Sequence, residues 1–141
     1  MKKTIKSKKL IKKMISLTAA VITLLSMTSC SAYKSRYKAV GFVHSNESAS
    51  SFMSFYRFDG TMVFKMKSAG EGDLTYSAKL ESGSATVYYD YRGSKTELFS
   101  INAGEEIGSH GGYVEKGTVY VIVETNGECQ NGDLKFSLDH S

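Results

Sequence analysis

The stretch TVYVIVETNGECQNGDLKFSLDH, residues 118–140, decides the fold class of this chain. Apolar and polar side chains alternate in it with a period of two on either side of a polar turn at Asn126–Asp133, which is the pattern of two half-buried β-strands. The apolar side chains that are expected to face the core are Val119, Val121, Val123, Leu134, Phe136 and Leu138. The end of the chain is therefore predicted to be two strands with one apolar face each.

The same alternation runs upstream as far as residue 51. Residues 52–58 and 61–67 are expected to form two strands joined by a type I′ hairpin at Asp59–Gly60, because an Asp-Gly pair favours that turn. The further elements expected in order are a strand at 74–80, a turn at 82–83, a strand at 85–91, a turn at 92–95 and a strand at 98–101. After residue 30 no window has the apolar spacing of an amphipathic helix.

Seven or eight short antiparallel strands, each with one apolar face, bury those faces most completely as two packed sheets. We therefore predict an all-β fold in which residues 51–141 form an antiparallel two-sheet β-sandwich. The chain has thirteen glycines and no proline, which suits a fold whose turns adopt positive φ.

The N-terminal part of the chain has a different composition. Residues 1–29 hold seven lysines and no acidic residue, and the lysines precede the apolar run MISLTAAVITLLSM at 14–27. A run of about 14 residues is too short for a permanent transmembrane helix, which needs about 20. This layout predicts a helical secretory signal peptide over residues 1–29 that is cleaved.

The residues before Cys30 indicate the kind of export. The sequence LSMTSC at 25–30 resembles the lipobox of bacterial lipoproteins, in which a Leu-like residue and two small residues precede a cysteine that receives a diacylglyceryl group. Thr28 and Ser29 occupy the small positions, whereas Met27 stands where the family usually has leucine. The resemblance implies cleavage between Ser29 and Cys30, an anchor of palmitate-type acyl chains on Cys30, and a place on the extracytoplasmic face of the cell membrane. The alternative is ordinary secretion with a free Cys30 thiol.

Residues 30–50 are expected to be the lipidated N-terminus and a tether, and the apolar run at 39–43 alternatively adds an early strand. The only other cysteine is Cys129, which has no disulfide partner within the chain if Cys30 is acylated.

The net positive charge of the whole chain comes from residues 1–29, the expected signal peptide. The formal charge is +4, but only eleven Lys and Arg residues follow position 29, against fourteen Asp and Glu residues, which is a net charge of −3. Binding to nucleic acid needs clustered basic residues that displace counterions from phosphates. After residue 38 the chain has no such cluster, so we expect no nucleic-acid partner.

A second resemblance concerns the C-terminal strands. Residues 117–124, followed by a polar turn and residues 132–138, are similar to the last two strands of the small bacterial β-sandwiches appended to secreted peptidases, the pre-peptidase C-terminal type domains. This resemblance implies an accessory module, and it carries over no catalytic residue.

Catalytic and metal-binding chemistry has little support in the sequence. His44 lies in the expected tether and His140 at the C-terminus, so a hydrolase could only be centred on His110, and no serine lies in a Gly-x-Ser-x-Gly motif. Glu105, Glu106 and His110 share an expected loop at 104–112, and other carboxylates are placed in expected turns: Asp59, Glu71, Asp73 and Asp133. Calcium needs six to eight oxygen ligands, and solvated turn carboxylates explain these residues better. We expect no enzyme activity, cofactor or metal site.

The tyrosines are the candidates for ligand binding. The chain has nine tyrosines and no tryptophan, and Tyr88, Tyr91 and Tyr113 could form an exposed platform that stacks sugars or peptide. Cross-strand packing alone is the other explanation for tyrosines in strands. The sequence thus predicts an exported, membrane-anchored lipoprotein that displays a small non-enzymatic binding or envelope module. Its expected partners are membrane lipid through the acyl anchor and a cell-surface glycan or protein.

Overall fold

The computed structural model describes residues 33–140. The expected signal peptide, its cleavage site at Ser29 and the lipid attachment site at Cys30 lie outside the described residues. Within the described part, no helix is long and apolar enough to cross a membrane.

Nine antiparallel strands make up the described domain. The prediction of an all-β antiparallel fold is confirmed, with two short early strands and seven longer ones. They are β1 (Arg36–Val40), β2 (Val43–Asn46), β3 (Ser50–Ser68), β4 (Gly72–Ser82), β5 (Ser84–Asp90), β6 (Thr96–Asn102), β7 (Glu105–Val114), β8 (Gly117–Thr125) and β9 (Cys129–His140).

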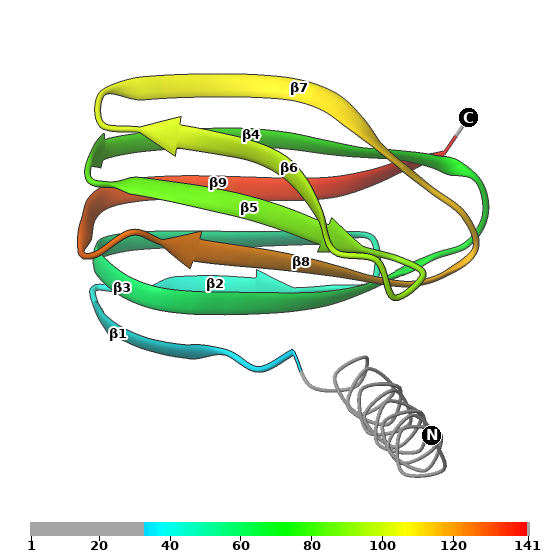
Figure 1. Cartoon of the computed structure of the whole chain (residues 1–141), viewed down its shortest axis with the longest axis horizontal. Coiled ribbons are helices and arrows are strands. Elements are labelled where there is room, and N and C mark those ends of the chain that lie inside the picture. The colour runs from blue at the N-terminus through cyan, green and yellow to red at the C-terminus, as the bar shows by residue number, and fades with distance from the viewer. Residues whose placement is uncertain (1–32, 141) are drawn as a thin grey trace, which may run out of the picture. The chain divides into compact units, whose positions relative to one another are not determined.

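Two long ribbons build the sandwich. β3 pairs with β9 through its first half and with β8 through its second half. The consecutive strands β4 and β5 pair in the same way with β7 and β6. The ribbons join through the pairs β4–β9 and β5–β8, which gives the strand order β6-β5-β8-β3-β9-β4-β7. Because each ribbon bends near its middle, this one sheet folds into two facing layers, with β5, β6 and β8 in front of β4 and β9 in Figure 1.

The predicted hairpin at Asp59–Gly60 is wrong, because β3 continues through these residues without reversing its direction. Phe58 pairs with Cys129 and Thr61 pairs with Glu124, so Asp59–Gly60 lies where β3 passes from one layer to the other. A type I′ turn needs positive φ at both central residues, but of these two only Gly60 has it. The Gly60 amide donates to Thr125 Oγ1 at 2.8 Å, a partner that no local sequence pattern reveals.

Two further local predictions are corrected by the structure. The expected loop at 104–112 is mostly β7, whose backbone pairs with β4. The expected turn at Asn126–Asp133 ends earlier, since β9 begins at Cys129. The turn predicted at 82–83 agrees with the structure, where it joins β4 to β5 in the other layer. Three of the carboxylates that were expected in turns, Asp59, Asp73 and Asp133, stand on strands.

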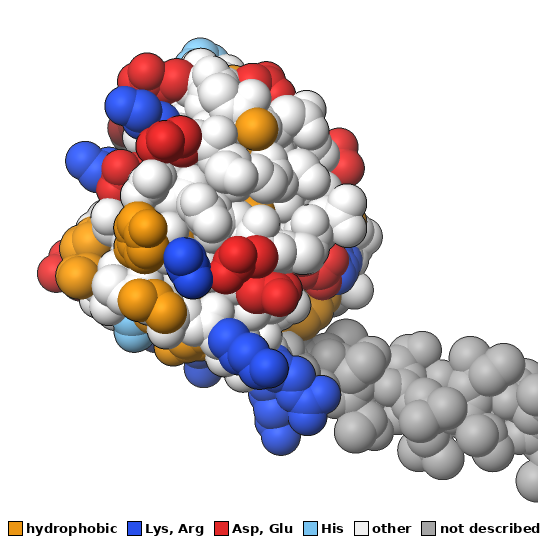
Figure 2. Space-filling model, turned by 90° about the vertical axis from the view of Figure 1, so that its left-hand side faces the viewer, with side chains coloured by type: hydrophobic (Ala, Val, Ile, Leu, Met, Phe, Trp, Pro, Cys, Tyr) orange, Lys and Arg blue, Asp and Glu red, His pale blue; other side chains and the backbone are white. Residues whose placement is uncertain are grey.

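Part of the range expected as a tether is folded onto β3. β1 pairs with residues 57–61 of β3, and β2 pairs with residues 51–54. The alternative of an early strand in this range therefore agrees with the structure. Hydrophobic and basic side chains are exposed at the end of the sandwich where β1 turns into β2, which faces the viewer in Figure 2.

The core contains the side chains that the alternation selects. All six apolar residues of β8 and β9 named above are buried, as are Met62, Phe64 and Met66 of β3. Aromatic rings pack across the two layers: the Phe136 ring centroid lies 5.9 Å from that of Phe64 and 6.3 Å from that of Phe99. One-sided burial thus explains why the strand faces could be predicted.

Cys129 is a buried core residue and not an exposed thiol. Its side chain has no exposed surface, and its Sγ donates to the carbonyl oxygen of Ser84 at 3.3 Å. Burial is the main cause that raises the pKa of the Cys129 thiol, so the group is protonated at neutral pH. It packs as a small hydrophobe at the start of β9.

Candidate functional site

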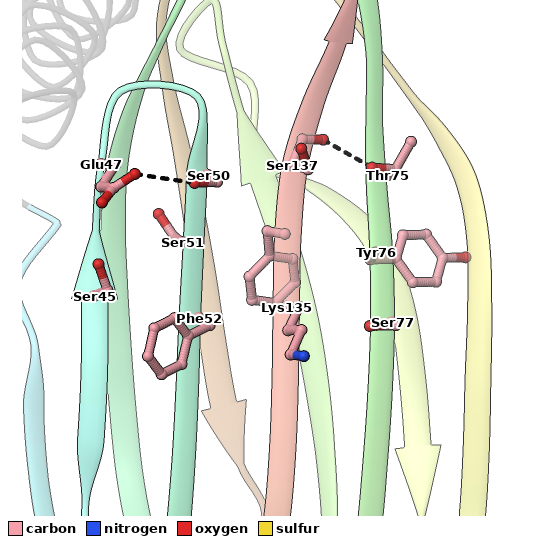
Figure 3. A pocket seen from close by; sticks show the side chains of 11 residues that line it. Ser45, Glu47, Ser50, Ser51, Phe52, Thr75, Tyr76, Ser77, Lys135 and Ser137 are labelled. Carbon is pink, nitrogen blue, oxygen red and sulfur yellow. Dashed lines mark hydrogen bonds between the residues drawn. The ribbon is translucent and has the colours of Figure 1, made fainter.

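A groove of about 530 Å³ lies on the outer face of β2, β3, β9 and β4, and we call it the sheet groove. Its lining combines one cation, from Lys135, one carboxylate, from Glu47, several hydroxyl groups and three aromatic residues, Phe52, Tyr76 and Phe136. The Phe136 ring is buried in the core, whereas the Phe52 ring is partly exposed in the groove. The hydroxyl groups on the face of Phe52 belong to Ser45, Ser50, Thr75, Ser77 and Ser137, whereas Ser51 is buried and its hydroxyl donates to Asn46 Oδ1 at 3.2 Å. Figure 3 shows these side chains on adjacent strands of one sheet.

Strand register places the groove residues in two rows across the sheet. In the first row Ser45 stands opposite Phe52, Phe52 opposite Lys135, and Lys135 opposite Ser77. Directly opposed residues of neighbouring strands point to the same face, and strands are about 4.8 Å apart. The row is therefore about 14 Å long.

The second row is tied together by hydrogen bonds. Ser50, Ser137 and Thr75 are opposed in the same way, two residues further along each strand. Thr75 Oγ1 donates to the Ser137 carbonyl oxygen at 3.1 Å, and Ser50 Oγ donates to Glu47 Oε2 at 3.4 Å (Figure 3). These contacts hold this end of the groove in one arrangement.

Phe52 and Lys135 are the groove residues whose side chains are available to contact a ligand. Phe52 is only partly buried although it lies in the middle of a sheet. Within residues 33–140, the Lys135 ammonium forms no ion pair or hydrogen bond. An aromatic face beside free donors and acceptors suits a ligand that has both an apolar face and hydroxyl groups.

The structure separates the three candidate tyrosines. Tyr91 and Tyr113 lie together, with ring centroids 6.5 Å apart and an interplanar angle of 88°, and Tyr89 stacks on Tyr91 at 6.2 Å. Tyr88 stands on the other face of β5, where the Lys95 ammonium lies 4.3 Å from its ring centroid. Tyr88 therefore does not share a platform with Tyr91 and Tyr113.

The tyrosine group is tied to neighbouring charges. The Tyr113 hydroxyl donates to Glu115 Oε1 at 3.3 Å, and the other carboxylate oxygen of Glu115 pairs with Arg92. Desolvation and the nearby carboxylate of Glu71 raise the pKa of Tyr113, and desolvation followed by the Tyr91 hydroxyl raises the pKa of Tyr89. Both hydroxyls therefore stay protonated at neutral pH.

His110, the histidine on which a hydrolase could be centred, stands on β7 opposite Thr75 of β4. Nδ1 of His110 lies 3.9 Å from Asp73 Oδ2, but 77% of the histidine side chain is exposed. In the described range, no hydroxyl or thiol is hydrogen-bonded to this ring. A nucleophile within hydrogen-bond reach of the base is the first requirement of a catalytic triad. The described residues also contain no group of three His, Cys, Asp or Glu side chains that could hold a metal ion.

Sequence reasoning missed the sheet groove because its residues come from four separate strands. Phe52, Ser77 and Lys135 appear in the sequence only as members of alternating strands. The available signal was the number of serines and threonines on the polar faces of 45–54, 75–77 and 135–137. That signal becomes a site only when the register of the strands is known.

No protein-family model matches this sequence, and neither does any curated protein. Solved structures with a similar arrangement include the pre-peptidase C-terminal domain of collagenase from Bacillus anthracis, at 17% identity over 67% of this chain and 93% of that one, with a TM-score of 0.46. CBM35 from Paenibacillus barcinonensis has 11% identity over 74% of this chain and 93% of that one, with a TM-score of 0.42. A family 29 carbohydrate-binding module in complex with mannohexaose has 12% identity, coverage of 75% and 90%, and a TM-score of 0.40. At such low identity the likeness carries no function over to this chain.

Proposed function

We propose that this chain is an exported lipoprotein, anchored through Cys30, whose β-sandwich binds a saccharide in the sheet groove without acting on it chemically. The observation that supports binding is the first row of the groove, where the Phe52 ring lies between Ser45 and Lys135, whose ammonium has no partner among residues 33–140. A sugar ring has an apolar face that packs on an aromatic ring and hydroxyl groups that pair with polar side chains at its edge. The lipobox-like sequence before Cys30 supports the anchor.

The anchor is tested by mass spectrometry of the N-terminal peptide from native membranes. We expect the processed chain to begin at Cys30 and to carry acyl chains, because a single chain is only marginally retentive and stable anchoring takes two signals. The matched control is Cys30→Ser, which removes the acceptor sulfur and should leave the protein without acyl chains. A wild-type peptide with an unmodified thiol would exclude the lipoprotein assignment.

The groove is tested by binding of immobilised cell-wall and plant polysaccharides to purified protein. We expect Phe52→Ala to weaken binding by roughly ten- to a hundredfold, since burying a phenylalanine ring is worth about 1.5–3 kcal/mol. Lys135→Ala should weaken it by a smaller factor through the loss of one donor.

The control for this experiment is Tyr88→Ala, which removes an equally large ring far from the groove and should leave binding unchanged. Tyr91→Ala serves the same purpose for the group around Tyr113. If Tyr91→Ala abolished binding while Phe52→Ala did not, the ligand site would be the tyrosine group. Retention of none of the polysaccharides by the wild-type protein would remove the saccharide proposal.

A further inference from the structure

A basic and apolar surface lies at the start of the domain. It is separate from the tyrosine group, and it adjoins the sheet groove without sharing a residue with it. We call it the β1 surface, and it consists of Arg36, Lys38, Val40, Val43, Tyr56 and Arg57. The exposed fractions of Val40, Val43 and Tyr56 are 57%, 59% and 50%. In Figure 2 hydrophobic side chains gather at the lower left of the face, and Lys and Arg side chains lie beside and beneath them.

The apolar and basic members of the β1 surface are neighbours through strand pairing. Val40 stands opposite Arg57 in the β1–β3 ladder, and the Tyr56 amide donates to the Gly41 carbonyl oxygen at 3.3 Å. The Arg57 guanidinium lies 5.3 Å from the centroid of the Tyr56 ring. Apolar side chains and cations therefore lie on one continuous strip of β1, β2 and β3.

The charge of this strip is opposite to that of the rest of the domain. Lys34 and the three basic residues of the β1 surface are accompanied by one carboxylate, Asp59 opposite Lys38, which gives a net charge of +3. The other residues after position 29 hold seven basic and thirteen acidic side chains, a net charge of −6. An anionic surface would attract this end of the domain and repel the remainder.

The proposed anchor at Cys30 is close enough in sequence to β1 to bring the domain near an anionic membrane surface. Arg36 is six residues after Cys30, and six extended residues span at most about 20 Å. Acylation of Cys30 would hold the Arg36 end of the β1 surface inside that distance of the phospholipid headgroups, and Val40 lies four strand residues, about 13 Å, further on. This step rests on the proposed function, because only the anchor places the domain at a membrane.

We propose that the β1 surface docks on a bilayer that contains anionic phospholipid. Val40, Val43 and Tyr56 enter the interfacial layer, where tyrosine is favoured, and the basic side chains meet the lipid phosphates. Ser50, in the second row of the sheet groove, is six residues from Tyr56 along β3, which is about 20 Å. Docking at the Tyr56 end therefore leaves the far end of the groove directed away from the lipid.

Docking is tested with residues 30–141 carrying Cys30→Ser, which keep every described strand and have no acyl chain. The probe is sedimentation with vesicles of phosphatidylglycerol mixed with phosphatidylcholine, against vesicles of phosphatidylcholine alone. We expect binding to the anionic vesicles only. The triple substitution Lys34→Glu, Arg36→Glu and Lys38→Glu should weaken it by about 100-fold, since each basic residue contributes about fivefold.

The matched control carries the same change of charge at three exposed lysines away from β1: Lys67→Glu, Lys79→Glu and Lys116→Glu. Its effect should be small at ordinary ionic strength, where the Debye length is about 8–10 Å. Equal losses in the two triple variants, or no sedimentation of the parent protein with anionic vesicles, would overturn the proposal. Because the protein in this test has no acyl chain, a failed anchor is recognised separately, from the mass of the native N-terminal peptide.

Discussion

Phe136→Ala is expected to lower the free energy of unfolding by about 3–5 kcal/mol, the range observed when phenylalanine is removed from a packed core. The side chain is 1% exposed. Its ring lies on β9 and packs across the sandwich against Phe64 of β3 and Phe99 of β6. Because those two rings are held by strands of the facing layer, they cannot both move to fill the space, and a cavity remains between the layers.

The measurement is urea unfolding followed by the tyrosine signal, with Phe52→Ala as the control. Phe52 is a phenylalanine of the same sheet whose ring faces outward into the sheet groove, so its removal leaves no enclosed cavity. We expect this control to lose less than about 1 kcal/mol, which is the scale of strand propensity. Similar losses in the two variants would mean that the ring of Phe136 does not carry the packing between the layers.

The sequence could predict which faces are buried because burial on one side imposes a period of two on a strand. Leu134, Phe136 and Leu138 point into the core and Lys135 and Ser137 away from it, as the alternation indicates. The pattern specifies the face of each strand, but it holds no information about which strand is the neighbour. The all-β class was therefore accessible, whereas the strand order was not.

The failure at Asp59–Gly60 has the same origin. An Asp-Gly pair between two alternating runs is a strong local hairpin signal. In this chain it is outweighed by pairing with β8 and β9, which begin more than fifty residues downstream: β9 pairs with β3 before the Asp-Gly pair and β8 pairs with β3 after it. In a hairpin, Met62, Phe64 and Met66 would pair with the first half of β3. They would then lose the partners that they have on β8.

The candidate site was less accessible than the fold. Tyr88, Tyr91 and Tyr113 were predicted to form a platform because they are large aromatic residues in expected strands and loops. Only Tyr91 and Tyr113 share a face. Phe52 and Lys135 are more than eighty residues apart and become neighbours only through the register of β3 and β9. Each is an unremarkable residue in its own strand.

Gly83→Ala is expected to lower the free energy of unfolding by about 2–5 kcal/mol, the sum of backbone strain and overpacking. Gly83 lies between β4 and β5 at φ +94°, where an L side chain is disfavoured by about 1–2 kcal/mol. A Cβ atom there would lie 2.7 Å from Cys129 Sγ and 2.8 Å from the Glu128 carbonyl oxygen. Since the second atom is backbone at the start of β9, the clash moves a strand and not merely a side chain.

Gly104→Ala separates the two parts of this effect, because Gly104 occupies the corresponding crossing between β6 and β7. Its φ is +80°, and a Cβ atom there would meet nothing within 4 Å. We expect it to lose only the backbone part, about 1–2 kcal/mol, in the same urea unfolding experiment. The double variant Gly83→Ala with Cys129→Ala removes Sγ but keeps the clash with the Glu128 carbonyl, so it should recover little of the loss. If Gly83→Ala were no worse than Gly104→Ala, the approach of β9 to the β4–β5 crossing would not be the close contact that requires glycine.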